Sequence, residues 1–300
     1  MRNKNKVDLI EGISVIIPCF NEQGGILSVI QDLQSTLKQS GLKHEIIVVD
    51  DASTDATSDI ATKAGAVVVE HGVNRGYGAS IKTGVRVAEY DHICITDGDG
   101  TYPSKVIPDL VSAVSDGADM AVGSRTGNIV KIPLIRRPAK FVITKIAESI
   151  AGISIPDLNS GLRVFKKSQV KKYSDILPNG FSFTTTITLA LLTNGFRVDY
   201  MAIDYESRIG NSKIRPISDT INFVTLILRM ALYFAPLKFF IPASFICILV
   251  AIAWALVSRF ALGQLADVTS TILVVLGIQI AVVGLLAEMI NKRLPSGRQD

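Results

Sequence analysis

The sequence contains only three cysteines, three histidines and one tryptophan among its 300 residues. Three cysteines are too few for a disulfide framework. Cys247 lies inside a long apolar run, and we expect Cys19 and Cys94 to be buried in strands. The three histidines do not have the spacing of metal ligands, so we expect them in the core or on the surface. These scarcities argue against a disulfide-stabilised fold and against a histidine-built metal site.

A long hydrophobic run is also missing from the N-terminus. The first six residues are polar and basic, and Ile13–Phe20 is too short and is interrupted by Pro18, so we expect no signal peptide. Charged residues amount to only 19% of the chain, whereas hydrophobic residues reach 48% and the mean hydropathy is +0.37. This composition is too apolar for an ordinary soluble protein, and part of the chain is expected to lie in lipid.

The apolar surplus is concentrated in two uncharged runs, Phe239–Ser258 and Val268–Ala287. Each has about 20 residues, the length that spans a bilayer core as a helix. Basic residues flank the pair on its outer sides, at Lys238 and after residue 291, whereas Arg259 in the connecting loop is offset by an aspartate. The positive-inside rule then places both termini and the bulk of the chain in the cytoplasm of a multi-pass protein of the cytoplasmic membrane.

Charge divides the rest of the chain into two halves. Residues 1–119 carry a net charge of about −7 and residues 120–236 about +9. One interpretation is that the acidic half holds metal ions and the basic half holds phosphate near an anionic membrane surface. The alternative is that these charges are ordinary solvated surface groups.

Short β-rich runs alternate with helical stretches between residues 12 and 124, which predicts a mostly parallel sheet covered by helices on both faces. The expected strands cover residues 13–20, 45–50, 66–70, 92–96 and 120–123, and the expected helices cover 26–39, 55–64, 79–88 and 106–115. Ligands bind outside the carboxyl ends of such strands. Polar residues follow nearly every run there: Asn21-Glu22, Asp50-Asp51, His71 to Asn74, Asp97 to Gly100, and Ser124-Arg125.

Two carboxylates two residues apart, in Asp97-Gly98-Asp99-Gly100, follow the fourth expected strand. Carboxylates so placed can hold Mg²⁺ or Mn²⁺ with positions left for the oxygens of a diphosphate. A calcium-binding EF-hand is excluded because Tyr102 and Pro108 stand where the loop needs glycine and glutamate. The alternative is a plain Asp-Gly turn.

A glycine-containing segment, Asn74–Ser80, is expected to open a helix and could present backbone N–H groups to a phosphate. It is not a dinucleotide fingerprint, because Ile81 occupies the third glycine position, and it is not a P-loop. A simple helix-start turn explains it equally well. Asp51, at the end of the second strand, could accept from a nucleobase or ribose or could be an N-terminal helix charge.

Beyond the sheet, an amphipathic run over residues 217–234 is expected to lie in the membrane interface. We therefore divide the chain into a cytoplasmic catalytic domain over residues 1–215, an interfacial helix over 216–236, and a two-helix membrane region over 237–300 that also offers a surface for self-association.

Seven motifs follow one another along the chain: Val15-Ile16-Ile17-Pro18 with Asn21-Glu22, Val48-Val49-Asp50-Asp51-Ala52-Ser53-Thr54-Asp55, Asn74-Arg75-Gly76-Tyr77-Gly78, Asp97-Gly98-Asp99, Val122-Gly123-Ser124-Arg125, Asp157 with Ser160-Gly161, and Arg208-Ile209-Gly210-Asn211-Ser212-Lys213. In this order they make the chain resemble family 2 glycosyltransferases, and within them the branch of dolichol-phosphate mannose synthases and bacterial polyprenyl-phosphate glycosyltransferases. The resemblance covers about residues 12–215.

The resemblance implies a GT-A fold and the inverting transfer of one hexose from a UDP- or GDP-linked sugar to an undecaprenyl or dolichyl phosphate, with Mg²⁺ or Mn²⁺ and without nucleic acid. Matching positions imply the following roles: Pro18, Glu22 and Asp51 at the nucleotide, Asp97 and Asp99 at the metal with Asp99 the more direct ligand, Asp157 as base, and Arg125, Arg136, Arg137, Arg208, Ser212 and Lys213 at the phosphates, Arg208 being also catalytic.

Two other functions stay open on the sequence. One is a processive polysaccharide synthase or a transferase acting on a larger glycan, although the Gln-x-x-Arg-Trp signature of processive relatives is absent. The other is a noncatalytic nucleotide-sugar-binding membrane protein. Phe181–Thr186 lacks acidic residues that many relatives carry near the sugar, so the identity of the sugar and nucleotide also stays open.

Overall fold

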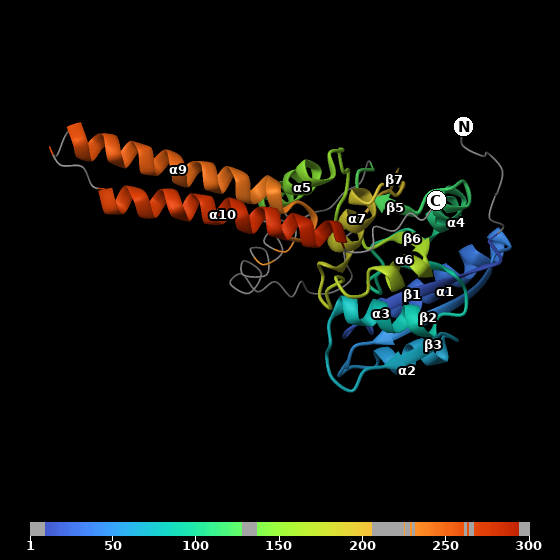
Figure 1. Ribbon diagram of the computed structural model, residues 1–300. Helices are drawn as coiled ribbons and strands as arrows, with labels where there is room; N and C mark the ends of the chain where they lie inside the picture. The colour runs from blue at the N-terminus through green and yellow to red at the C-terminus, as the bar shows by residue number, and fades with distance from the viewer. Residues whose placement is uncertain are drawn as a thin grey trace. The chain divides into compact units, whose positions relative to one another are not determined.

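The computed structural model describes residues 10–127, 137–205, 225, 229, 232–260, 263 and 267–293 (Figure 1). The chain divides into two compact units, Met1–Arg215 and Pro216–Asp300. The interfacial helix predicted over residues 216–236 lies mostly outside the described residues. The two units are considered separately below.

The first unit is built on a seven-stranded sheet with the strand order β3-β2-β1-β4-β6-β5-β7. The strands are β1 (Gly12–Cys19), β2 (Lys43–Asp50), β3 (Val67–Glu70), β4 (His92–Ile95), β5 (Met120–Ser124), β6 (Arg163–Lys166) and β7 (Val198–Ala202). Only β6 runs antiparallel to its neighbours, β4 and β5. The mostly parallel sheet confirms the predicted α/β class, and the strands expected from the sequence are all present.

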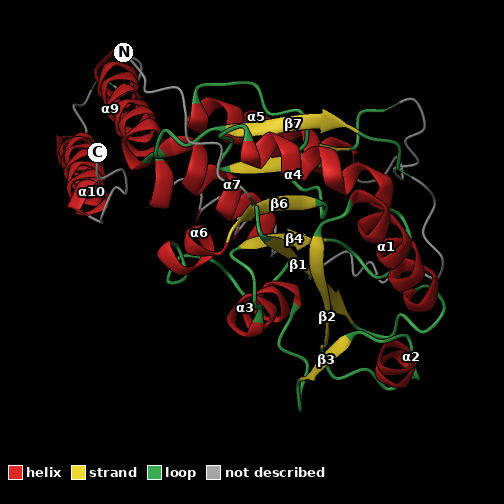
Figure 2. Ribbon diagram, turned by 90° about the vertical axis from the view of Figure 1, so that its right-hand side faces the viewer, coloured by secondary structure: helices red, strands yellow, loops and turns green. Residues whose placement is uncertain are grey.

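Helices cover both faces of the sheet (Figure 2). On one face lie α1 (Ile26–Ser40), α2 (Thr57–Lys63) and α4 (Ile107–Ser115), the last preceded by the short helix η1 (Ser104–Val106); on the other lie α3 (Tyr77–Val87), α5 (Arg137–Ala151), α6 (Lys167–Lys172) and α7 (Phe183–Thr193). Helix α7 is not among the elements expected from the sequence.

The alternation of side chains along β1 explains the two layers. Ile13, Val15 and Ile17 face the core shared with α1 and α4, whereas Ile16 points toward α3. Helix α3 approaches closely because it has Gly84 at the contact, where a Cβ atom would lie 2.5 Å from Cγ2 of Ile16. The strands are apolar on both faces, as expected for a buried parallel sheet.

The chain order places a switch point between β1 and β4. From β1 the chain moves outward to β2 and β3, and then returns to the other side of β1 as β4. Ligands bind at such a point, outside the carboxyl ends of the strands. Pro18 fits this position because the pairing of β1 with β4 ends at Ile16 and Ile95, so the missing N–H of Pro18 breaks no bond to β4.

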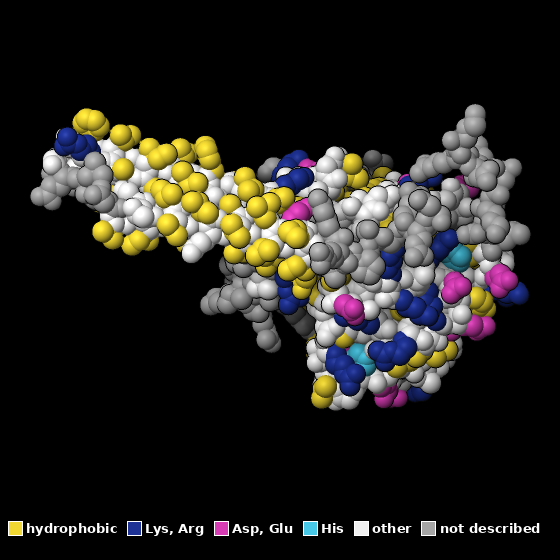
Figure 3. All heavy atoms as spheres, viewed as in Figure 1, with side chains coloured by type: hydrophobic (Ala, Val, Ile, Leu, Met, Phe, Trp, Pro, Cys, Tyr) yellow, Lys and Arg dark blue, Asp and Glu magenta, His cyan; other side chains and the backbone are white. Residues whose placement is uncertain are grey.

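The second unit contains two long apolar helices, α9 (Pro236–Phe260) and α10 (Asp267–Arg293). Both are long and apolar enough to cross a membrane, as predicted, and hydrophobic side chains cover much of their visible surface (Figure 3). Between them, the hydroxyl of Ser244 donates to the carbonyl of Gly277 at 2.6 Å. Gly284 faces Phe240, so small residues let the two helices pack closely.

Candidate functional site

The loop after β1 and the loop after β2 hold each other in place. Asn21 and Ala52 adopt left-handed backbone conformations, with φ of 55° and 65°. The backbone N–H of Asn21 donates to Ser53 Oγ at 2.8 Å, and the Thr54 N–H donates to Asn21 Oδ1 at 2.7 Å. Ser53 in turn donates from its backbone N–H and its hydroxyl to the buried Asp50 carboxylate. A non-glycine residue such as Ala52 keeps this strained conformation only where its surroundings impose it.

Asp51 organises the segment that begins α3. Its carboxylate accepts from Nδ1 of His71 at 2.7 Å and from the backbone N–H groups of Arg75 at 2.8 Å and Gly76 at 2.7 Å. The other ring nitrogen of His71 lies 2.9 Å from the Thr83 hydroxyl. Two N–H groups of the glycine-containing segment therefore bind Asp51, and His71 is a core residue as expected.

The residues predicted at the nucleotide lie together at one end of the sheet. The Asp51 N–H donates to the carbonyl of Cys19, which follows Pro18, at 2.8 Å, and the Glu22 N–H donates to Thr57 Oγ1 at 2.9 Å. Cys19 and Cys94 are buried as predicted. Burial, reinforced by the charges of Glu22 and other nearby carboxylates, raises the pKa of the Cys19 thiol.

The two carboxylates of the Asp97–Asp99 pair have different surroundings. Asp99 is buried, and its Oδ1 accepts from the hydroxyl of Thr101 at 2.7 Å and from the Thr101 N–H at 3.2 Å. Asp97 is half-buried and accepts from the Tyr77 hydroxyl at 3.2 Å. Among the described residues no group of three or more His, Cys, Asp or Glu side chains could hold a metal ion. The pair nevertheless offers the oxygen ligands that Mg²⁺ and Mn²⁺ prefer, and diphosphate oxygens can complete such a site.

Aromatic residues and a glycine surround Asp97. A Cβ atom on Gly161 would lie 2.9 Å from both carboxylate oxygens of Asp97, so no side chain fits there. The Gly161 N–H donates to the Tyr102 hydroxyl at 2.7 Å. Burial, followed by the charge of Asp97, raises the pKa of Tyr102 and of Tyr77. Both hydroxyls therefore stay protonated near neutral pH.

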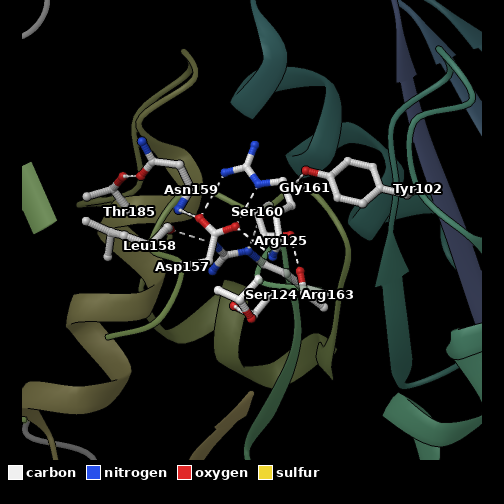
Figure 4. Close-up of polar contacts among 12 residues, drawn as sticks. Tyr102, Ser124, Arg125, Asp157, Leu158, Asn159, Ser160, Gly161, Arg163 and Thr185 are labelled. Carbon is white, nitrogen blue, oxygen red and sulfur yellow. Dashed lines mark hydrogen bonds and ion pairs between the residues drawn. The ribbon is translucent and has the colours of Figure 1, made fainter. Parts of the chain in front are cut away.

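Asp157 and Arg125 form a buried bidentate ion pair (Figure 4). Arg125 Nε lies 2.7 Å from Oδ2 of Asp157 and Nη2 lies 2.9 Å from Oδ1, while the Arg125 N–H also donates to Oδ2 at 3.0 Å. The Asn159 N–H adds a bond of 3.3 Å. Burial alone would lower the pKa of Arg125, but the hydrogen bonds to Asp157 raise it above its usual range. The ring of Tyr205 lies 5.2 Å from the guanidinium carbon.

Arg163 is a fully buried cation that sequence reasoning missed. On β6, it donates to the carbonyls of Ser160 and Leu158, both at 2.7 Å, and to the Thr188 hydroxyl and Thr184 carbonyl of α7 at 2.5 and 3.1 Å. Burial lowers its pKa. Arg163 thus ties the loop that carries Asp157 to α7. A charged residue directly before the apolar Val164 and Phe165 was the only signal in the sequence.

Several predicted site residues lie in parts of the chain that the structure does not describe. Arg136, Arg208, Ser212 and Lys213 lie outside the described residues, and Arg137 begins α5 with a side chain that is likewise not described. The structure thus brings together the residues predicted at the nucleotide, the Asp97–Asp99 pair, and the Asp157–Arg125 pair. Within the described part of the second half, Arg125 and Arg163 are both held by protein groups rather than left open to solvent.

The fold and site define an α/β protein whose carboxylates gather at the switch point of the sheet, where ligands bind. The family model described as glycosyl transferase family 2 matches residues 14–174, and the chain belongs to this family. This confirms the family resemblance. A second model, the GtrB C-terminal hairpin, matches residues 235–292.

Individual proteins of known sequence are also similar to this chain. The chain is 33% identical over 199 residues to the uncharacterized protein MJ1222 of Methanocaldococcus jannaschii, covering 64% of this chain and 80% of that protein. It is 26% identical over 209 residues to a dolichyl-phosphate hexose transferase of Haloferax volcanii, covering 69% and 89%. Similarity to such proteins supports the predicted polyprenyl-phosphate branch.

Among solved structures, the fold resembles glucosyl-3-phosphoglycerate synthase from Mycobacterium tuberculosis, crystallised with Mn²⁺, UDP and phosphoglyceric acid. The TM-score is 0.59 at 18% identity, with 74% of this chain and 78% of that chain covered. This likeness confirms the predicted GT-A fold.

Proposed function

We propose that the protein transfers a single hexose from a UDP- or GDP-linked sugar to a polyprenyl phosphate, with inversion, at the cytoplasmic face of the membrane. The observation that carries the proposal is the Asp97–Asp99 pair at the switch point of a family 2 sheet, in a chain that also has two helices able to span a membrane. The similar dolichyl-phosphate hexose transferase supports a lipid phosphate as acceptor.

The donor binds at the carboxyl ends of β1, β2 and β4. Pro18, Glu22 and Asp51 surround the nucleoside, and Asp51 also holds the start of α3 in position. Asp97 and Asp99 hold Mg²⁺ or Mn²⁺, which when bound offsets the charge that develops on the departing diphosphate. The Mn²⁺ and UDP bound by the similar synthase support this arrangement.

The acceptor phosphate is held by cations of the second half. Arg136, Arg137, Arg208 and Lys213, with the Ser212 hydroxyl, neutralise it so that two anions can approach each other. Arg208 contributes directly to catalysis by this means. A phosphate oxygen attacks the anomeric carbon, the bond to the donor diphosphate breaks, and a single displacement inverts the configuration.

Asp157 has two candidate roles in this reaction. A polyprenyl phosphate is already anionic near pH 7, so its attack requires little help from a base. The four hydrogen bonds that Asp157 accepts from Arg125 and Asn159 favour a positioning role over the role of base. In that role Asp157 keeps the loop after β5 in place beside the sugar.

The second unit anchors the enzyme beside its lipid substrate. We propose that α9 and α10 cross the cytoplasmic membrane, that both termini lie in the cytoplasm, and that residues 216–236 rest in the interface at the depth of lipid phosphates. The exposed apolar surface of α9 and α10 also allows self-association of the chain.

A donor panel tests the proposal. Purified protein in detergent is incubated with a short-chain polyprenyl phosphate, Mn²⁺ or Mg²⁺, and UDP- or GDP-linked glucose, galactose, mannose or N-acetylglucosamine. We expect a lipid carrying one sugar from one of these donors, and no product with Asp97→Asn. A growing polymer would instead identify a processive synthase, and donor binding without turnover would identify a noncatalytic protein.

A further inference from the structure

Phe181 presents an unusually exposed aromatic ring beside the Asp97–Asp99 pair. Its side chain is 84% exposed, the largest value among the large hydrophobic residues described. One face of the ring stacks on Tyr77, with the centroids 5.4 Å apart and the planes inclined by 21°. The hydroxyl of Tyr77 in turn donates to Oδ1 of Asp97 at 3.2 Å. A continuous chain of contacts therefore joins a surface ring to a predicted metal ligand.

The backbone before Phe181 is fixed on α3. The carbonyl of Asn179 accepts from the Ala79 N–H at 3.0 Å, and Lys82 Nζ donates to Asn179 Oδ1 at 2.9 Å. The contact is close because α3 begins with glycines: a Cβ atom on Gly78 would lie 2.3 Å from the Pro178 carbonyl oxygen. The stacking of Phe181 on Tyr77 is thus built into the backbone of both segments.

Asp97 and Asp99 are held by different kinds of neighbour. Asp99 is buried and receives two hydrogen bonds from Thr101, two residues along the chain. Asp97 is half-buried, and Gly161 packs so close to it that a Cβ atom there would lie 2.9 Å from both carboxylate oxygens. A hydrogen bond from a group near a metal-binding carboxylate fixes the orientation of that carboxylate and so raises metal affinity.

We propose that Tyr77 is a positioning residue that orients the carboxylate of Asp97 toward a divalent cation, and that Phe181 holds the Tyr77 ring in the required place. The inference rests on the proposed function, because that function assigns the metal to Asp97 and Asp99. Neither aromatic residue contacts the reacting atoms in this scheme; both act through Asp97.

The test measures metal binding directly, by electron paramagnetic resonance of free Mn²⁺ titrated into the full-length protein in detergent with UDP or GDP. Tyr77→Phe removes only the hydroxyl and is expected to weaken Mn²⁺ binding roughly tenfold, in line with a hydrogen bond to a charged group. Phe181→Ala is expected to weaken it about threefold, and Phe181→Tyr, which keeps the stacked ring, is expected to restore it.

Tyr90→Phe is the matched control. Tyr90 lies just before β4, at the opposite end of the sheet, with its ring against Gly12, and its variant should bind Mn²⁺ as the wild type does. In turnover assays, Tyr77→Phe should need a higher Mn²⁺ concentration for half-maximal rate. Its kcat at saturating Mn²⁺ should stay within about twofold of the wild-type value. The thermal unfolding temperature should not change for Phe181→Ala, because its side chain is exposed.

The outcomes separate this inference from the proposed function. Wild-type Mn²⁺ affinity in Tyr77→Phe, or an equal loss in Tyr90→Phe, overturns the role of Tyr77. Unchanged Mn²⁺ affinity in Phe181→Ala overturns the role of Phe181. If the same variant also binds phospholipid vesicles more weakly than the wild type, Phe181 is a membrane contact instead. Absence of Mn²⁺ binding by the wild type with both nucleotides overturns the metal assignment itself and the inference with it.

Discussion

The two halves of the sheet hold their buried charges in different ways. At the ends of β1 to β4, the carboxylates of Asp50, Asp51 and Asp99 are held by backbone N–H groups, hydroxyls and one histidine. Around β5 to β7, Arg125 is paired with Asp157, and Arg163 is bound by carbonyls and a hydroxyl. Backbone N–H groups and hydroxyls fix a carboxylate without cancelling its charge, whereas the Arg125–Asp157 ion pair cancels most of the charge of both partners.

This difference suits the two tasks in the proposed reaction. In the proposed reaction the negative charge of the first half stays available for a metal ion, because backbone N–H groups and hydroxyls orient the carboxylates without neutralising them. The second half uses buried charges to hold loops together. Arg136, Arg137, Arg208 and Lys213 remain predicted ligands of the lipid phosphate, and Arg125 could join them only through guanidinium N–H groups that Asp157 does not use.

Replacing a carboxylate of the metal pair should have the largest effect. Asp97→Asn and Asp99→Asn keep the side-chain size but remove the charge that a divalent cation needs. Transfer in either variant should fall about a thousandfold. Initial rates with the preferred donor measure this, and Asp109→Asn, an exposed carboxylate in the first turn of α4, serves as control. Near-normal rates in both variants would show that the acidic half does not hold a metal.

The next largest effect concerns the stability of the second half. Arg163→Met leaves buried carbonyls of Leu158 and Ser160 without donors and should destabilise this region by about 3 kcal/mol. Hydrogen-exchange mass spectrometry on peptides from β6 and α7 measures the change locally. Arg197→Met is the control, because Arg197 pairs with Asp199 at the surface and should contribute less than about 1 kcal/mol. If peptides from β6 and α7 are equally protected from hydrogen exchange in Arg163→Met and Arg197→Met, Arg163 has no special structural role.

A double-mutant cycle on Arg125 and Asp157 should show a coupling of about 2 kcal/mol in the transition-state free energy of transfer, because each residue loses its partner in either single variant. The hydrogen bonds to Asp157 raise the pKa of Arg125, so the stabilisation that the Arg125 charge contributes is lost as pH rises through that raised value, far above neutral. If Asp157 acts by positioning, Asp157→Asn should lower the transfer rate by the same factor at every pH between 5.5 and 8.5. If Asp157 acts as a base, the fall in rate that the wild type shows toward acid pH should be missing in Asp157→Asn.

The smallest effect is expected at Asp55, in the loop after β2. Despite some opposing desolvation, hydrogen bonds from Thr57 and from the Gln23 N–H lower the pKa of Asp55. The stabilisation, about 1 kcal/mol at most, is therefore present above the ordinary carboxyl pKa and is lost as pH falls through the lowered value. Melting temperatures at pH 7, 5 and 3.5 should show Asp55→Asn approaching the wild type only in acid. Asp59→Asn, exposed in α2, should show no such convergence.

Much of the fold could be predicted because the strands are continuous apolar runs between polar residues. The run Ile46–Val49 is buried throughout, and Asp50 and Asp51 end it at the expected edge. The boundaries of α1 and α4 were also close, since Gly41 ends the first in a left-handed conformation and Pro108 lies in the first turn of the second. The hydrophobic periodicity did not identify α7, because threonines and apolar residues are buried all around this helix and it has no separate apolar face.

The functional roles of individual side chains could be predicted only in part. Asp97 and Asp99 are predicted metal ligands because two carboxylates at a strand end suggest metal binding, and that role stays a prediction. Tyr77 was noticed only as part of a glycine-containing segment, since its contact with Asp97 crosses 20 residues of chain. The pairing of Arg125 with Asp157 crosses 32 residues and has no local sequence signal at all.

By itself, the sequence determined the order of strands and helices, the two apolar helices and the polar residues that end each strand, because these depend on local patterns of apolar and polar residues. Tertiary structure alone decided which of those polar groups meet. Asp51 was expected at a nucleotide and also binds His71 and the start of α3, and Arg125 was expected at a phosphate and binds Asp157. Hydrogen bonds depend on distances of about 3 Å between groups far apart in the chain, and only folding sets those distances.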